Sequence, residues 1–269
     1  MNSNPVISFD LDGTLLNHAE RIHPRDLALL KNPPAGCLML PTTGRPLFSV
    51  KEIFNRNGLF AGQALPWPLV MQNGAAIYQC GEQLVEYVPF SAEVRKELIA
   101  FARQHPKITF FFMDLAASYT LGVSDYSAQV ADRHGLNSRV FEDGAEQCQF
   151  SKVLVISDHE DEFNNFAEVV NPLAVKVETS LPGFYEISPL GVSKGKGLMR
   201  LLDYIGLTGA KVFAAGDGQN DLSTFEIADF KLAPATAQQK VRARADRVIE
   251  WESEGILGPL LRQAGVLAS

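Results

Sequence analysis

Cysteine is scarce in this chain of 269 residues, which has three: Cys37, Cys80 and Cys148. They are far apart, form no Cys-x-x-Cys pair and have no histidine nearby, which argues against a zinc site. The odd number and wide spacing also argue against a disulfide framework. We therefore expect reduced cysteines in a cytoplasmic protein.

The sequence also lacks an excess of basic residues. It has 24 Lys and Arg against 31 Asp and Glu, a formal charge of −7 and a pI of about 5.3, which argues against nucleic-acid binding. The polar segment Met1–Pro5 resembles neither a signal peptide nor a membrane anchor, so we expect no membrane partner. We expect a monomer or a weak homodimer.

Hydrophobic residues make up 46% of the chain, as in ordinary globular proteins. Short apolar runs alternate with amphipathic stretches in the first and last parts of the chain, which predicts an α/β domain with a parallel sheet. Its expected strands are Val6–Phe9, Cys37–Leu40, Leu69–Gln72, Val212–Ala215 and one near Val248, and its expected helices are Pro24–Leu30, Leu47–Asn57, Lys194–Ile205 and Asp221–Ala228.

The middle of the chain predicts a separate α+β unit. We expect residues 80–188 to form this inserted domain, and residues 1–79 and 189–269 to form the core domain. A hairpin is expected around Cys80-Gly81, between Ala76–Gln79 and Glu82–Val88. The other expected elements are helices at Ala92–Gln104 and Glu160–Val170, and strands at Ile108–Met113, Lys152–Ser157, Ala174–Thr179 and Tyr185–Ser188. The stretch Ala116–Gln149 is the least readable, because its helical signal at Tyr126–His134 is short and its Gly and Asp content is typical of turns.

Two carboxylates, Asp10 and Asp12, stand two residues apart directly after the first expected strand. In extended backbone they can face the same side, because side chains repeat every second residue. Such a pair is repulsive unless a cation or a shared proton relieves it, which suggests a metal ion or a nucleophile beside an acid/base. A solvated Asp-Gly turn would explain the same residues, so this segment alone does not decide.

A second polar segment, Thr42-Thr43-Gly44-Arg45-Pro46, follows the second expected strand. The Thr43 hydroxyl, the Gly44 amide and the following helix start suit a phosphate oxygen. A helix N-cap followed by Pro would account for the Thr and the Pro, but not for Gly44-Arg45.

Two further segments open helices in the last part of the chain. Lys194 lies among glycines at an expected helix start, where the helix dipole disfavours a cation unless an anion neutralises it, although surface lysines are common. Asp217, Asn220 and Asp221 surround a glycine turn and match a hard-cation site, whereas an N-cap would explain only one Asp. Because the polar clusters are expected at strand exits of one sheet, together they predict a phosphate and Mg²⁺ site.

The order of these motifs resembles the haloacid dehalogenase superfamily: Asp-x-Asp-Gly-Thr, then Thr before Gly-Arg, then Lys, then Gly-Asp-x-x-Asn-Asp. Asn73-Gly74-Ala75 and the long insert resemble the Cof-type phosphatases with a large cap. The resemblance implies a Rossmann-like core with an inserted α+β cap domain. The stretch Leu232–Ala237 departs from the family pattern, which leaves the transfer of a substrate from relatives insecure.

The resemblance also implies roles for individual residues. Asp10 would attack phosphorus to form an aspartyl-phosphate, and Asp12 would protonate the leaving oxygen and later activate water. Mg²⁺ would be held by the Asp10 carboxylate, the Asp12 main-chain carbonyl and Asp217, with Asp221 supporting through water. The residues expected to bind the phosphoryl group or the rest of the substrate are Thr43, Gly44, Arg45, Lys194 and Asn220.

These expectations favour a Mg²⁺-dependent phosphatase that acts on a small phosphorylated metabolite such as a sugar phosphate. A phosphomutase or phosphotransferase of the same superfamily would use the same motifs. A phosphorylatable switch or a non-catalytic phosphate sensor also combines an acidic cluster with a Thr and a Lys, but receiver domains are shorter and lack the second Asp. The motifs do not identify the substrate.

Overall fold

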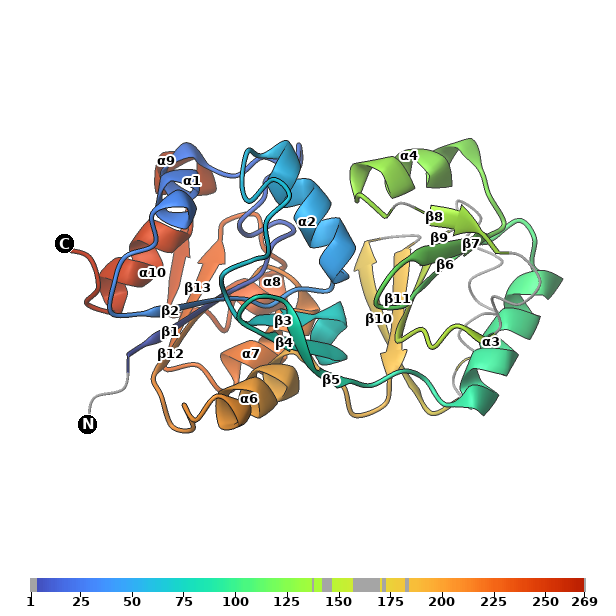
Figure 1. The fold of residues 1–269 in the computed structure, drawn as a ribbon. Helices are drawn as coiled ribbons and strands as arrows, with labels where there is room; N and C mark the ends of the chain where they lie inside the picture. Colours follow the sequence, from blue (N-terminus) through green and yellow to red (C-terminus); the bar gives the residue numbers. More distant parts are fainter. Residues whose placement is uncertain are drawn as a thin grey trace. The chain divides into compact units, whose positions relative to one another are not determined.

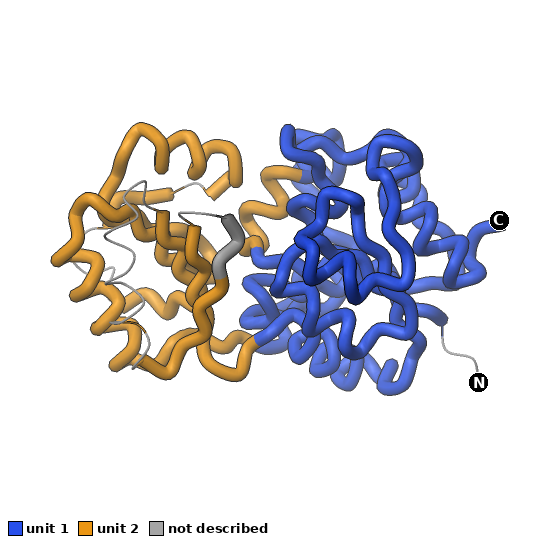
Figure 2. The backbone as a smooth tube through the Cα atoms, turned by 180° about the vertical axis from the view of Figure 1, so that it is seen from behind, with its two compact units in different colours: residues 1–44, 54–86, 193–269 blue, residues 45–53, 87–192 orange. Residues whose placement is uncertain are grey.

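The computed structural model describes residues 4–136, 138–141, 147–156, 170, 173–181 and 184–268. The chain folds into two compact units (Figures 1 and 2). Unit 1 contains residues 1–44, 54–86 and 193–269, and unit 2 contains residues 45–53 and 87–192. The expected domain bounds at residues 79 and 189 stay a prediction.

A five-stranded parallel sheet forms the centre of unit 1, in the order β14-β13-β12-β1-β2. Its central strands are almost wholly apolar and buried, as strands covered on both faces must be. A three-stranded sheet, β3-β4-β5, continues from it, because Thr42 forms a parallel bridge with Val70. The strands are β1 (Val6–Phe9), β2 (Leu38–Pro41), β3 (Leu69–Met71), β4 (Ala76–Gln79), β5 (Gln83–Tyr87), β12 (Val212–Ala215), β13 (Phe230–Pro234) and β14 (Arg247–Ile249).

Helices cover both sides of this sheet (Figure 1). Leu198, Leu201 and Leu202 of α6 pack into one apolar cluster with Val6 and Val212 of the central strands. Helices α1 and α10 lie on the other side. The helices of unit 1 are α1 (Pro24–Lys31), the end of α2 (Leu47–Arg56), α6 (Lys194–Tyr204), α7 (Leu222–Phe225), α8 (Gln239–Arg242), α9 (Trp251–Glu254) and α10 (Leu257–Gln263), with 3₁₀ turns η1 (Gln72–Gly74) and η3 (Gln219–Asp221).

Unit 2 is built on a mainly antiparallel sheet in the order β10-β11-β9-β6-β7-β8. Phe110 and Phe112 of β6 face α3, whereas Phe111 lies in a second cluster with Val130 of α4. This alternation is that of a strand buried on both faces. The elements are α3 (Ala92–Gln104), β6 (Thr109–Met113), β7 (Ser118–Leu121), α4 (Asp125–Arg133), β8 (Ser138–Val140), β9 (Lys152–Ile156), β10 (Val175–Leu181) and β11 (Phe184–Pro189).

The expected fold class, a parallel-sheet core with an α+β insert, agrees with this architecture. The expectation of one long helix over Asp221–Ala228 is wrong, because the chain forms η3 and then the single turn α7 there. The expected helix Glu160–Val170 and the strand end at Ser157 lie outside the described residues, apart from Val170 itself.

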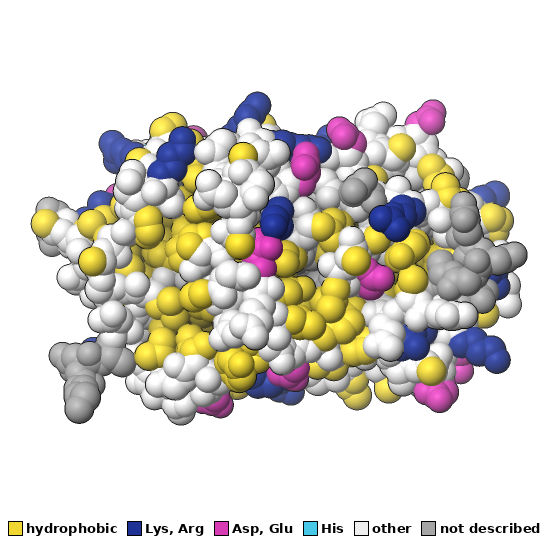
Figure 3. Space-filling model, in the orientation of Figure 1, with side chains coloured by type: hydrophobic (Ala, Val, Ile, Leu, Met, Phe, Trp, Pro, Cys, Tyr) yellow, Lys and Arg dark blue, Asp and Glu magenta, His cyan; other side chains and the backbone are white. Residues whose placement is uncertain are grey.

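Charged side chains of both signs are interspersed on the face shown in Figure 3. That face gives no sign of the continuous basic surface that nucleic acid would require, which is consistent with the acidic composition. None of the helices in the described ranges combines the length and apolar character needed to cross a membrane.

Asp26, in the first turn of α1, is completely buried and caps another helix. Its carboxylate accepts the amide hydrogens of Ile256 at 2.7 Å and Leu257 at 2.9 Å, at the start of α10. Burial is the largest influence on this group, and it raises the pKa of Asp26 to about 6, although the backbone hydrogen bonds act in the opposite direction. The folded protein therefore binds this proton more tightly than the unfolded chain does.

We expect stability to depend on pH through Asp26. Because its pKa is higher in the folded state, its contribution to the free energy of unfolding is full below pH ~4 and declines as the pH rises through ~6, by about 3 kcal/mol in all. Urea unfolding at pH 4.5 and 7 should show a larger decline in the wild type than in Asp26→Asn, by up to about 3 kcal/mol. Equal pH dependence in the two proteins would contradict the assignment.

Candidate active site

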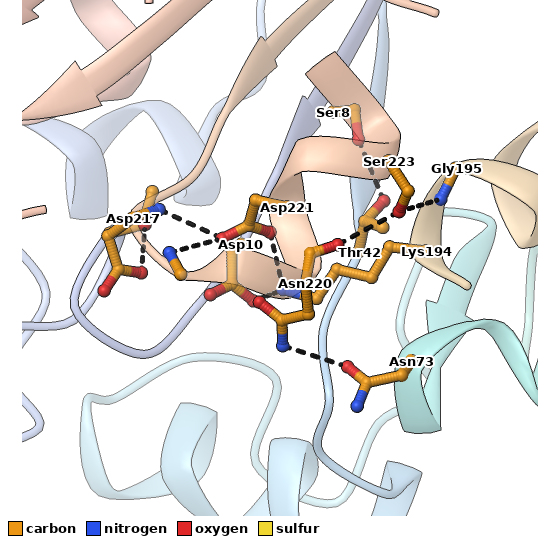
Figure 4. Close-up of polar contacts among 12 residues, drawn as sticks. Ser8, Asp10, Thr42, Asn73, Lys194, Gly195, Asp217, Asn220, Asp221 and Ser223 are labelled. Carbon is orange, nitrogen blue, oxygen red and sulfur yellow. Dashed lines mark hydrogen bonds and ion pairs between the residues drawn. The ribbon is translucent and has the colours of Figure 1, made fainter. Parts of the chain in front are cut away.

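The polar residues singled out in the sequence converge at one edge of the unit 1 sheet. Asp10 follows β1, Asp217 and Asp221 follow β12, and Lys194 is the first residue of α6. Because β1 and β12 are parallel neighbours, their carboxyl ends open on the same edge. Figure 4 shows these side chains pointing toward one another.

Lys194 joins two of these carboxylates (Figure 4). Its Nζ lies 2.8 Å from Oδ1 of Asp10 and 2.6 Å from Oδ1 of Asp221, and the lysine is only 1% exposed. Burial by itself would lower the pKa of Lys194, but the two carboxylates outweigh it and the pKa is raised above its ordinary value. The ammonium is therefore charged and bound on two sides.

Lys194 does not neutralise all the negative charge of these carboxylates. Burial raises the pKa of Asp10 well above its ordinary value, Lys194 opposes the shift, and the charges of Asp221, Asp217 and Asp12 add to it. Burial and then the charge of Asp221 raise the pKa of Asp217 to about 7. One lysine thus compensates only part of the negative charge, which leaves room for a further cation.

The loop after β12 fixes Asp221 through its own backbone. Oδ2 of Asp221 accepts the amide hydrogens of Asp217 at 3.0 Å and Gly218 at 2.9 Å. Gly216 is required for this turn, because a Cβ there would lie 2.4 Å from the Cβ of Asp221. With Oδ1 on Lys194 and Oδ2 on the loop, both oxygens of Asp221 are engaged.

Asp217 is held by the loop that contains the first motif. Thr14 Oγ1 donates to Oδ1 of Asp217 at 2.9 Å, and a Cβ on Gly13 would lie 2.4 Å from Oδ2. Thr14 was not among the residues chosen from the sequence, although the Asp-x-Asp-Gly-Thr motif contains it. The main-chain carbonyl of Asp217 accepts the amide hydrogen of Gln238 at 3.0 Å, and Gln238 directly follows the stretch Leu232–Ala237.

Three carboxylates fit a hard divalent cation. Asp10, Asp217 and Asp221 each offer an oxygen, and these oxygens lie within 4.8 Å of one another. Carboxylate oxygens are the ligands that Mg²⁺ prefers, and a cation would offset the burial and the mutual repulsion that raise the pKa of Asp10 and Asp217. The carboxylate of Asp12 is not part of this triple, and the expected contribution of its main-chain carbonyl stays a prediction.

The segment after β2 lies beside the loop that follows β3. Thr43 is fully buried, and its amide donates to the Val70 carbonyl at 2.8 Å. Its carbonyl accepts the amide hydrogen of Asn73 at 3.1 Å. Asn73 in turn accepts a hydrogen bond from Nδ2 of Asn220 at 3.1 Å (Figure 4). Asn73 was not among the site residues expected from the sequence, and the signal that could have identified it is the Asn-Gly pair at the end of a strand.

Arg45 forms hydrogen bonds within the protein that the sequence did not indicate. Its Nη1 donates to Ser49 Oγ at 3.1 Å and to the His134 carbonyl at 2.8 Å, and its Nη2 lies 3.1 Å from Nδ1 of His134. These contacts lie within unit 2. They give Arg45 a structural role, and its expected contact with substrate stays a prediction.

Comparison with known proteins identifies the family. A family model described as haloacid dehalogenase-like hydrolase matches residues 7–258, nearly the whole chain. The chain belongs to this family. The match confirms the resemblance drawn from the motifs, and places the protein among the hydrolases.

Relatives and solved structures agree with this assignment. The chain is 26% identical over 257 residues to the pyridoxal phosphate phosphatase YbhA of Escherichia coli, covering 91% of this chain and 92% of that one. It is 25% identical to the 5-amino-6-(5-phospho-D-ribitylamino)uracil phosphatase YwtE of Bacillus subtilis, covering 92% and 93%. The structure of TM0651 from Thermotoga maritima matches with a TM-score of 0.81 and 25% identity, covering 97% of each chain. The sugar phosphatase BT4131, a subclass IIB protein, shares the fold, with a TM-score of 0.78 and 22% identity over 97% of this chain and 99% of that one.

Removing Lys194 should destabilise the metal-free protein by an amount that depends on pH. In Lys194→Met, Asp10 and Asp221 lose their buried counter-charge, which should lower the free energy of unfolding at pH 7 by about 3–5 kcal/mol. The folded-state pKa of Asp10 should rise further, so the loss should shrink as the pH falls and Asp10 takes up a proton. Urea unfolding in EDTA at pH 5 and 7 measures both effects. An equal loss at the two pH values would contradict this account.

Proposed function

We propose that this protein is a Mg²⁺-dependent phosphatase that hydrolyses small phosphorylated metabolites through an aspartyl-phosphate on Asp10. The observation that carries the proposal is the position of Lys194 between Asp10 and Asp221, inside a cluster of three carboxylates. A buried lysine on Oδ1 of Asp10 fixes the carboxylate orientation that an attack through the other oxygen requires. The relatives named above act on phosphate esters of small molecules, which supports the same substrate class here.

The first half of the proposed reaction transfers the phosphoryl group to Asp10. A carboxylate oxygen of Asp10 attacks phosphorus while the bond from phosphorus to the leaving oxygen breaks. The carboxyl group of Asp12 gives its proton to that oxygen, so the leaving group departs as a neutral alcohol. Lys194, Thr43 and the Gly44 amide would neutralise and orient the phosphoryl oxygens, with Asn220 and Arg45 as further candidate contacts.

The second half hydrolyses the aspartyl-phosphate. The Asp12 carboxylate takes a proton from a water molecule, whose oxygen attacks phosphorus, and the bond from phosphorus to Asp10 breaks. Inorganic phosphate leaves, Asp10 is again a carboxylate, and Asp12 is again protonated for the next cycle.

Mg²⁺, held by Asp10, the Asp12 carbonyl and Asp217, with Asp221 acting through water, would supply positive charge to the phosphoryl oxygens. The engagement of both Asp221 oxygens supports an indirect role for that residue. The cytoplasmic location and the oligomeric state expected from the sequence stay predictions.

The Asp10→Asn variant tests the proposed reaction. With Mg²⁺ present, the wild type should release phosphate from para-nitrophenyl phosphate, and EDTA should stop it. Asp10→Asn keeps nearly the same shape but lacks the nucleophile, so we expect a loss of at least about 10³-fold in kcat. A panel of phosphorylated metabolites scored for phosphate release then defines the substrate. Phosphoryl transfer within the substrate without phosphate release would indicate a mutase, and no turnover of any ester would refute the phosphatase.

Asp12 should affect proton transfer and not metal binding. Asp12→Asn removes the acid/base but keeps the main-chain carbonyl, so we expect kcat to fall by about 10²–10⁴-fold while the Mg²⁺ affinity changes little. Titration of the activity and of the heat of binding with Mg²⁺ measures both quantities. A large loss of Mg²⁺ affinity would show that the Asp12 carboxylate is itself a ligand.

A further inference from the structure

The turn η1, after β3, has a conformation that side chains normally avoid. Gln72, Asn73 and Gly74 have φ values of 51°, 56° and 93°. Two of these three residues with positive φ are not glycine, and such strain persists only where surrounding contacts hold it. Strained turns of this kind are frequent at functional sites.

Helix α6 holds this turn through close contact. A Cβ on Gly74 would lie 2.2 Å from the Ser193 carbonyl oxygen, and one on Gly197 would lie 2.7 Å from the Cα of Gly74. Nη2 of Arg200, also on α6, donates to the Gly74 carbonyl at 2.9 Å. The helix that begins with Lys194 thus also fixes the backbone of the turn.

The strained turn presents Asn73 to the site. Its side-chain Oδ1 accepts the hydrogen bond from Nδ2 of Asn220, the residue before Asp221 (Figure 4). The Asn220 carbonyl accepts a hydrogen bond from Ser223 Oγ at 3.0 Å, and Ser223 Oγ accepts the amide hydrogen of Gly195 at 3.1 Å. The backbone of Asn220 is therefore tied to the start of α6, and its carboxamide is oriented by Asn73.

We propose that Arg200 and Asn73 are positioning residues for Asn220. Arg200 holds the carbonyl of Gly74, the turn keeps Asn73 in its left-handed conformation, and Asn73 orients the carboxamide of Asn220 toward the substrate. The last step rests on the proposed function, because it takes Asn220 as a substrate contact. The first two steps concern the free protein and can be tested without substrate.

Arg200 has a second partner that provides a matched control. Its Nη1 lies 3.0 Å from Oε1 of Glu86 on β5, and both side chains are more than a third exposed. Exposed ion pairs contribute little to stability. Glu86→Gln removes this ion pair and leaves the hydrogen bond from Arg200 to the Gly74 carbonyl in place.

The side-chain amide resonances of Asn220 in a ¹H–¹⁵N spectrum test the proposal directly. Asn73→Gly deletes the acceptor but tolerates positive φ, and Arg200→Met releases the Gly74 carbonyl. We expect both variants to shift the Asn220 resonances in the same direction and Glu86→Gln to leave them unchanged. Unshifted resonances in Arg200→Met, or an equal shift in Glu86→Gln, would overturn the proposal. If Arg200→Met does not fold, Arg200→Lys replaces it. Because lysine keeps a hydrogen-bond donor, Arg200→Lys should shift the Asn220 resonances less than Asn73→Gly does.

Kinetics then test the substrate step. We expect Arg200→Met and Asn220→Ala each to lower kcat/KM for the best ester by about threefold to tenfold, as the loss of one hydrogen bond would. Because Arg200 acts through Asn220, the double variant should lose no more than Asn220→Ala alone. Additive losses would overturn this step. If the wild type hydrolyses no ester, the proposed function fails, and the spectra still decide whether Arg200 and Asn73 orient Asn220.

Discussion

The site depends on one buried cation, the ammonium of Lys194, which lies between Asp10 and Asp221. Without it, two buried carboxylates would lack compensation, a cost larger than most single interactions in a protein can offset. Even with it, burial and mutual repulsion keep the pKa of Asp10 and of Asp217 raised. A divalent metal ion would neutralise this remaining negative charge. The bound ion would also give an acidic protein the positive charge that it needs to bind an anionic substrate.

The backbone is arranged to bring these charges together. Glycine is needed at two positions, because a Cβ on Gly13 would meet the Asp217 carboxylate and a Cβ on Gly216 would meet the side chain of Asp221. The parallel pairing of β1 with β12 then places the two loops at the same edge, although about 200 residues separate them in the sequence. The chemistry of the site therefore follows from the sheet order as much as from the motifs.

The sequence predicted those parts of the structure that have a local signal. The apolar runs at Val6–Phe9 and Val212–Ala215 are strands of the parallel sheet, and the strand exits carry the acidic cluster. Strand β13 was missed because Phe230–Pro234 contains a lysine and ends in proline, so its apolar run is short. The partners of Arg45 and the role of Asn73 could not be predicted, because each depends on contacts between segments that lie far apart in the chain.

The central claim is that Asp10, held by Lys194, is the group that receives the phosphoryl group. Rapid quenching in acid during turnover of a good ester, followed by peptide mass spectrometry, tests it most directly. We expect an acid-stable, hydroxylamine-sensitive phosphoryl group on Asp10, which disappears as turnover ends. A phosphoryl group on another residue would contradict the role of Asp10. Steady turnover in which no acyl-phosphate accumulates, even in the Asp12→Asn variant, would contradict it as well.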